Sequence, residues 1–137
     1  MAKKYEILEH KADLKIRVFG KTKEELFLNA LFGMQDCMKP ELKKPEEKAG
    51  RGIKIKSPDL PALLVDFLSE VLYLIQVNKE TYSDIKFKKF SDTEIEADLI
   101  GQKVERFGED IKAATYHGLD IHQKEDETWE TTILFDI

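Results

Sequence analysis

The order of apolar and polar residues divides the first 40 positions into two predicted strands and a helix. Apolar and polar side chains alternate through residues 5–9 and 13–18, and Gly20 closes the second run. Residues 22–25 have the Thr-x-x-Glu form of a capping box, so a helix is expected to begin there and to end before Pro40. Its buried stripe is expected at the apolar residues with helical spacing, which are Leu26, Phe27, Ala30, Leu31, Met34, Cys37 and Met38.

A second and more regular helical pattern follows a polar segment. Residues 39–50 are rich in Lys, Glu and Pro and are predicted to form a solvated loop, with a glycine turn at residues 50–52 and a short strand at residues 53–55. Residues 57–61 place a polar cap and then a proline near the first helical position, and Asn78 marks the expected end of the helix. Its core stripe is expected at Leu64, Phe67, Leu68, Val71, Leu72 and Ile75.

From Thr81 onward the period of the pattern changes to two. Alternating runs at residues 85–88, 94–99, 111–117 and 129–137 predict strands. Two helices and about seven strands predict an α+β fold, in which two helices pack on a mostly antiparallel sheet system. No repeat, low-complexity segment or linker divides the sequence, so a single domain spanning residues 1–137 is expected.

Composition limits the class of protein. Hydrophobic residues make up 42% of the 137 residues, which is enough for a buried core and argues against disorder. No apolar run is judged long enough to span a bilayer, and the N-terminal residues lack the apolar stretch of a secretion signal. A single cysteine, Cys37, cannot form an intrachain disulfide. We therefore expect a cytoplasmic protein that does not bind a membrane.

The charge balance argues against direct binding of nucleic acid. The formal net charge is −5, whereas proteins that bind RNA or DNA on their own usually carry a basic surface that neutralises phosphates. If the chain acts on RNA, it is expected to do so through a partner protein. The high charged fraction, 36%, with both signs interleaved, is also compatible with a thermophilic source.

The common catalytic and cofactor motifs are absent from the sequence. It contains neither a Walker loop nor a dinucleotide fingerprint, and it has no Cys-x-x-Cys pair. Three His and one Cys at scattered positions do not form a zinc pattern, and Cys37 lies on a helical stripe, which is typical of a small core residue.

The remaining candidates are polar residues near the ends of predicted strands. Asp13 opens a strand, and Asp136 interrupts the apolar ending "ILFDI" beside Ile137, whose α-carboxylate ends the sequence. Three carboxylates brought together would suit a hard cation such as Ca²⁺ or Mg²⁺. Lys112 is a candidate to compensate their mutual repulsion. Each residue also has a simpler interpretation. Asp13 would lie on a solvated face, Asp136 on the surface of a strand, and Lys112 would be an ordinary outward lysine.

Two histidines could orient such a site. His10 stands three residues before Asp13, and His117 ends the alternating run that contains Lys112. On the pattern alone, each is more often a structural histidine.

Four segments resemble the archease family. They are "YEILEHKADLKIRVFGKTKEELFLNA", "LPALLVDFLSEVLYLI", "IKAATYHGLDI" and the ending "ILFDI". They extend over nearly the whole chain and occur in the family's order. The opening His-Thr-Ala-Asp motif of the family reads His10-Lys11-Ala12-Asp13 here, so the threonine is replaced by lysine.

The resemblance implies a function that composition cannot show. It implies the α+β fold above, with a strand-helix-strand-strand unit at its centre. Archeases are cofactor proteins of the GTP-dependent tRNA-splicing RNA ligase, so this chain is expected to promote guanylylation of the ligase and its multiple turnover, with no catalysis of its own. By resemblance, activation depends on Asp13, Lys112 and Asp136, and a divalent cation, Ca²⁺ or alternatively Mg²⁺ or Mn²⁺, binds at Asp13, Asp136 and Ile137. RNA would be contacted only through the ligase.

Other functions stay open at this stage. The chain could modulate another tRNA-modifying enzyme, such as a tRNA methyltransferase, as an adaptor or chaperone. It could be a metal-dependent hydrolase that uses Asp13 and Asp136, although no general base or substrate pocket is evident from the sequence. It could also be a structural partner without a metal.

Overall fold

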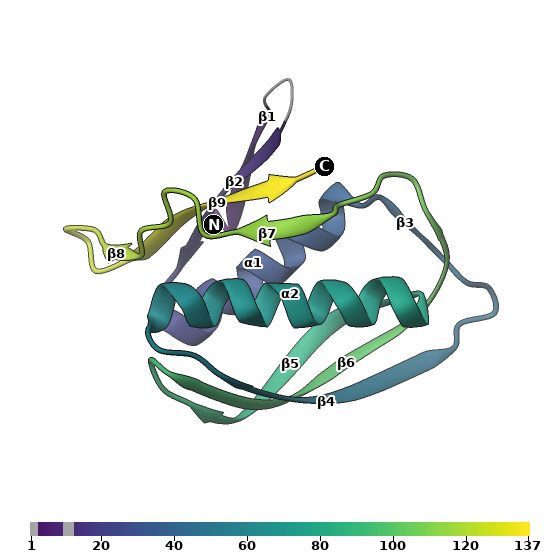
Figure 1. The fold of residues 1–137 in the computed structure, drawn as a ribbon. Coiled ribbons are helices and arrows are strands. Elements are labelled where there is room, and N and C mark those ends of the chain that lie inside the picture. Colours follow the sequence, from purple (N-terminus) through teal and green to yellow (C-terminus); the bar gives the residue numbers. More distant parts are fainter. Residues whose placement is uncertain (1–2, 10–12) are drawn as a thin grey trace.

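The computed structural model describes residues 3–9 and 13–137, and these residues form two helices and two antiparallel sheets. Figure 1 shows helices α1 (Lys23–Cys37) and α2 (Leu60–Asn78) in a layer between the two sheets. Helix α1 packs on strands of both sheets, and so does α2. The fold class is therefore α+β, as the hydrophobic pattern predicts.

The first sheet contains both ends of the chain. Its strands follow the order β1 (Tyr5–Glu9), β2 (Asp13–Gly20), β9 (Trp129–Asp136) and β7 (Ala113–Thr115), and the short β8 (His122–Gln123) also pairs with β9. Burial along β2 alternates strictly, as expected for a strand with one face on the core. This sheet joins strands that are more than 100 residues apart in the sequence.

The second sheet is built around the long strand β6 (Glu94–Phe107). Strands β4 (Lys48–Lys56) and β5 (Glu80–Phe90) pair with β6, and β3 (Pro40–Leu42) pairs with its C-terminal end. Every strand pairing in the described residues is antiparallel.

Three predictions about segments outside the helices are wrong. The expected solvated loop at residues 39–50 contains β3 and the start of β4, and the expected glycine turn at residues 50–52 lies within β4. Arg51 pairs in register with the buried Leu99, so its side chain points to the core side of the sheet and binds the buried Glu80 there. The expected strand at residues 111–117 is strand only at Ala113–Thr115, because a turn closed by the Leu119 N–H and the Tyr116 carbonyl follows.

Side chains cap both helices at their N-termini. The Thr22 hydroxyl accepts a hydrogen bond from the Glu25 N–H at 3.0 Å, which confirms the predicted start of α1. For α2 the cap is Asp59, whose carboxylate accepts from the Ala62 N–H at 2.9 Å. Helix α2 ends at Asn78 as predicted, with Lys79 in the left-handed conformation at φ 52°.

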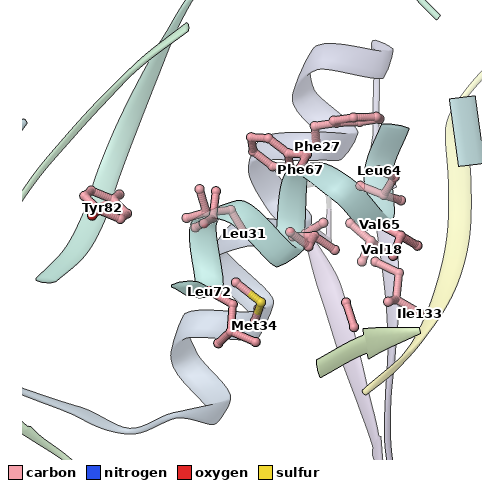
Figure 2. Close-up of a cluster of buried hydrophobic side chains, with 14 of the residues drawn as sticks. Val18, Phe27, Leu31, Met34, Leu64, Val65, Phe67, Leu72, Tyr82 and Ile133 are labelled. Atoms are coloured by element: carbon pink, nitrogen blue, oxygen red, sulfur yellow. The ribbon is translucent and has the colours of Figure 1, made fainter. Parts of the chain in front are cut away.

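Helix α2 is apolar enough to cross a membrane by length and composition, contrary to the expectation from the sequence. Half of this apolar stretch is buried inside the protein, as is typical of a core helix. Its buried side chains include Leu64, Phe67 and Leu72, and Figure 2 shows Phe67 and Leu72 beside the side chains of Phe27 and Met34 of α1. The apolar character of α2 therefore has a structural use in the core.

The core connects both helices with both sheets. In Figure 2, Val18 of β2 and Ile133 of β9 lie beside Leu64 and Val65 of α2. The rings of Phe27 and Phe67 pack with their centroids 5.5 Å apart and join the two helices. This packing fixes β2 and β9 against the helices, so the residues at the ends of these strands have defined positions.

Candidate functional site

Two aspartates face each other where β2 begins and β9 ends. Asp13 is the register partner of Asp136, and Asp136 is also the partner of Ala113 on the other side of β9. Residues directly opposite each other in an antiparallel pair have Cα atoms about 4.5–5.5 Å apart, and their side chains lie on the same face of the sheet. The first sheet therefore brings together two acidic residues from opposite ends of the sequence.

The alternation of the strands places this pair on the face opposite the core. The next register row contains Leu14, Phe135 and Ala114, all of which are buried. Because successive side chains point to opposite faces, the row of Asp13, Asp136 and Ala113 points away from the core. Asp13 is nevertheless half-buried, whereas Asp136 is exposed.

One carboxylate oxygen of this pair lacks a partner. Asp13 Oδ1 is buried and accepts no hydrogen bond from any residue that the structure describes. A buried polar atom left unsatisfied costs about 1–3 kcal/mol, more if it is charged. A bound cation would remove this cost, and carboxylate oxygens are the ligands that Ca²⁺ and Mg²⁺ prefer. The donor chemistry at Asp13 and Asp136 therefore fits the implied cation.

The described side chains do not form a complete metal centre. In residues 3–9 and 13–137, no group of three or more His, Cys, Asp or Glu is arranged to hold a metal ion. The expected ligand set had only two such side chains, Asp13 and Asp136, and took its third carboxylate from the main chain of Ile137. Ile137 directly follows Asp136 and lines the same cavity as Asp13.

Lys112 lies next to Asp136, on the side of β9 opposite Asp13. Its backbone N–H donates to the Asp136 carbonyl at 2.7 Å, one residue before β7 begins. Its side chain is exposed, so it can be truncated without loss of core packing. The main chain thus places Lys112 beside Asp136, and the ammonium extends into solvent.

The two histidines expected to orient the site are placed differently. His10 lies outside the described residues. His117 is exposed in the turn after β7, four residues beyond Ala113 and therefore on the side of β7 that points away from Asp136. The chain leaves the strand after Thr115, so His117 is not in the register row of the aspartates, and its orienting role stays a prediction.

A cavity of about 340 Å³ opens beside Asp13. Its walls come from β1, β2, the end of α1, the residue before β3, the segment before β7 and the residue after β9. The lining residues are Ile7, Asp13, Leu14, Asp36, Cys37, Lys39, Glu109, Asp110, Ile111 and Ile137. We call this space the acidic cavity. Asp136 and Lys112 do not line it, so the aspartate pair and the cavity share Asp13 as their common residue.

The acidic cavity contains residues that the sequence analysis missed. The Tyr5 hydroxyl donates to Asp36, and burial together with the Asp36 carboxylate raises the pKa of Tyr5 to about 12. Lys39 Nζ lies 3.6 Å from a Glu109 carboxylate oxygen. One signal was available in the sequence, because an aspartate in the last turn of a helix is unfavourable beside the negative end of the helix dipole. Cys37, expected in the core, is half-buried and lines the cavity.

Comparison with known proteins identifies the family. The sequence model of the archease protein family matches residues 5–137. The chain belongs to the archease family. It is 37% identical over 143 residues to protein archease of Methanosarcina barkeri, covering 98% of this chain and 97% of that protein. It is 32% identical over 142 residues to protein archease of Thermococcus kodakarensis, covering 98% and 99% of the two chains.

Solved structures share the fold of this archease. The solution structure of protein 1598 from Methanobacterium thermoautotrophicum superposes with a TM-score of 0.70 at 22% identity, covering 97% of this chain and 98% of that chain. The crystal structure of an archease from Thermotoga maritima, described as a possible chaperone, gives 0.69 at 21% identity and covers 100% and 98%.

Proposed function

We propose that this archease is an accessory protein of a GTP-dependent tRNA-splicing RNA ligase and promotes the guanylylation and multiple turnover of that enzyme. Family membership supports the proposal, since the resemblance that identified the family also implies this partner. The observation that carries it is the register pairing of Asp13 with Asp136, next to the backbone bond of Lys112. These are the three residues to which the resemblance assigns activation.

The geometry of the aspartate pair suggests how the chain would act on a partner. The two carboxylates lie at a strand end on the face opposite the core, where Asp136 is exposed to another protein, and main-chain pairing holds them in place. Asp13 and Asp136 would hold a divalent cation, which would supply positive charge for binding phosphate oxygens. Lys112 would add a second cationic contact beside Asp136.

The contribution proposed for this chain is orientation and electrostatics at the active site of the ligase. Activation of this kind requires no acid–base or nucleophilic residue on the activator, because a fixed charge near a reacting triphosphate lowers the barrier without covalent chemistry. The net charge of −5 agrees with contact to RNA through the ligase alone.

The test is ligation by the cognate ligase with and without this protein, at excess RNA over enzyme. We expect the protein to convert a single-turnover reaction into one with many turnovers and to accelerate formation of the guanylylated ligase. Purified protein alone should leave cyclic-phosphate RNA and nucleotides unchanged. Equal ligase turnover with and without the protein would reject the proposal.

A chaperone-like or adaptor function, for example toward a tRNA methyltransferase, is the second candidate. The observation in its favour is an apolar pair on the outer face of α2, where Tyr73 is 58% and Val77 61% exposed. A chaperone function would make Tyr73→Ser and Val77→Ser reduce the suppression of client aggregation. The same substitutions should leave ligase activation unchanged if the aspartate pair is the functional site.

A further inference from the structure

The acidic cavity has apolar walls and an acidic opening. Leu14 and Ile111 are buried, with exposed fractions of 9% and 1%, and they form part of the apolar wall of the cavity. Ile7 and Ile137, in contrast, are 44% and 46% exposed. Scattered exposed aliphatic residues are normal on a protein surface, but here two large ones border a single cavity. This arrangement leaves apolar surface available for a side chain from another molecule.

The charges around the cavity are not balanced. Four carboxylate side chains line it, and Lys39, its single basic residue, lies beside Glu109. Gln76 donates to Asp110 at 3.3 Å and supplies no charge. Asp13 contributes to the lining as well, but its Oδ1 is buried and is left to the cation of the aspartate pair. The complementary occupant is a cation with an apolar stem.

Arginine matches this requirement in shape and chemistry. Its methylene stem packs on apolar walls, while its planar guanidinium offers five N–H donors to carboxylates and is less strongly hydrated than an ammonium. A volume of about 340 Å³ is at the lower end of the roughly 300–1,000 Å³ range of ligand pockets, which suits a single side chain better than a helix or strand.

We propose that the acidic cavity is a docking site for an arginine side chain of the partner protein. The guanidinium donates to the carboxylates of Asp36, Glu109 and Asp110, while its stem packs between Ile7 and Ile137. Docking there brings the Asp13–Asp136 pair against the partner, because Asp13 belongs to both sites. Arginine docking rests on the proposed function in one respect only, which is that the partner protein would be the ligase.

The test uses the isolated protein, without divalent metal and with a chelator present. N-acetyl-arginine amide is titrated while backbone amide shifts are followed by NMR, beside the uncharged isostere N-acetyl-citrulline amide and, in a third titration, spermidine. We expect saturable shifts at Ile7, Cys37, Ile111 and Ile137 with the arginine probe alone. Shifts of equal size with citrulline, or no saturable shifts, would overturn the site. If spermidine bound at these residues more tightly than the arginine probe, the proposal that the cavity binds a protein side chain would be overturned.

Paired variants separate the rim charges from general electrostatics. Glu109→Gln with Asp110→Asn should weaken arginine binding by about two- to fivefold for each charge removed, as for exposed ion pairs. Glu46→Gln with Glu47→Gln removes two adjacent exposed carboxylates that do not line the cavity, and it should leave the affinity unchanged. Equal weakening by both double variants would contradict a defined site. Thermal melts confirm that each variant is folded.

A ligase assay distinguishes failure of this proposal from failure of the proposed function. The Glu109→Gln/Asp110→Asn variant should need a higher concentration for half-maximal activation, with an unchanged plateau. An unchanged half-maximal concentration would overturn arginine docking but would leave activation intact. If the wild-type protein activates no ligase, the proposed function fails, while the NMR titration still decides whether the cavity binds a guanidinium.

Discussion

The role proposed for Lys112 depends on the charge of its side chain. Its main chain is fixed by the bond to the Asp136 carbonyl, while its side chain is exposed and buries no apolar surface in the core. We expect Lys112→Ala to reduce ligase guanylylation at saturating GTP and to change stability by less than about 0.5 kcal/mol, as for other surface substitutions. The measurement is the guanylylation rate beside a thermal melt.

Substitution of Lys112 with arginine distinguishes two roles of the lysine ammonium group. A purely electrostatic role would tolerate Lys112→Arg in part, whereas a compact ammonium in a tight site would not, because the guanidinium is larger and planar. Wild-type activation by the Lys112→Ala variant would show that Lys112 is an ordinary surface lysine.

Glu80 carries the most deeply buried charge in the described structure. Its side chain is 1% exposed and accepts two hydrogen bonds of 2.8 Å from Arg51, one from Lys103 and one from the Tyr82 hydroxyl. These donors, Arg51 first, hold the pKa of Glu80 at about 2, below its usual 4.5. The carboxylate therefore ties β4, β5 and β6 together in its ionised form.

This pKa shift predicts how stability depends on pH. A lowered folded-state pKa contributes stability above pH 4.5, and this contribution is lost as the pH falls from 4.5 to about 2. The shift corresponds to a contribution on the order of 3 kcal/mol. We expect Glu80→Gln to lower the free energy of unfolding at pH 7 and to flatten its decline over this pH window, measured by urea denaturation at several pH values.

An exposed ion pair provides the control for Glu80. Arg106 contacts Glu41 at 2.6 Å, but both side chains are at least 60% exposed. Glu41→Gln should change stability by no more than about 1 kcal/mol. Losses of similar size in the two variants would contradict the structural role assigned to the buried network.

At the scale of elements, the second sheet depends on a glycine in its central strand. A Cβ on Gly101 would lie 1.8 Å from the Thr81 carbonyl oxygen and 2.7 Å from the Tyr82 Cα, close to an irregularity in the β5–β6 register. Because these are backbone atoms, the strands would have to move apart. We expect Gly101→Ala to destabilise the protein by about 3 kcal/mol or more, as judged by denaturant midpoints.

Gly50 on β4 is the matched control for this prediction. The nearest atom to a Cβ at Gly50 is the Leu99 carbonyl oxygen at 3.7 Å, an ordinary contact distance. Gly50→Ala should leave stability within about 0.5 kcal/mol of wild type. Equal tolerance of alanine at both positions would mean that β5 and β6 are not paired as described.

The end of β9 allows a test of the cation site. Deleting Asp136 and Ile137 removes one side-chain carboxylate and moves the terminal carboxylate back to Phe135, but it removes little core surface at the end of a strand. We expect the deletion to weaken Ca²⁺ or Mn²⁺ binding strongly, as measured by calorimetric titration, and to lower the melting temperature only slightly. Ile137→Ala keeps both carboxylates and should bind like wild type. An unchanged affinity after the deletion would remove this end of the chain from the site.

The elements differ in how well the sequence predicts them. Both helices follow from local signals, a capping box at Thr22 and the Asp-Leu-Pro entry at Asp59, which depend on neighbouring residues only. The prediction of a glycine turn at residues 50–52 is wrong, because the residues that stabilise a strand there are distant in the sequence. Arg51 is held by Glu80 of β5, and the pairing of β4 and β5 with β6 brings these two residues together.

At the scale of the whole molecule, the site depends on the closure of the first sheet. Asp13 and Asp136 come from opposite ends of the chain, and strand alternation alone could not predict that they face each other; the family resemblance indicated a shared site. The acidic cavity was missed, since Asp36 lies on α1 and Glu109 lies between two strands of different sheets. Residues that become neighbours only through tertiary packing leave no local pattern in the sequence.

The central claim is that Asp13 and Asp136 act as one unit in activating the ligase. The most direct measurement is a double-mutant cycle on the guanylylation rate of the ligase, with Asp13→Asn, Asp136→Asn and the double variant at saturating concentrations. Groups that act together are strongly non-additive, so each single variant should lose most of the activation and the double variant should lose little more. Independent losses that multiply in the double variant, or full activation by either single variant, would contradict the account.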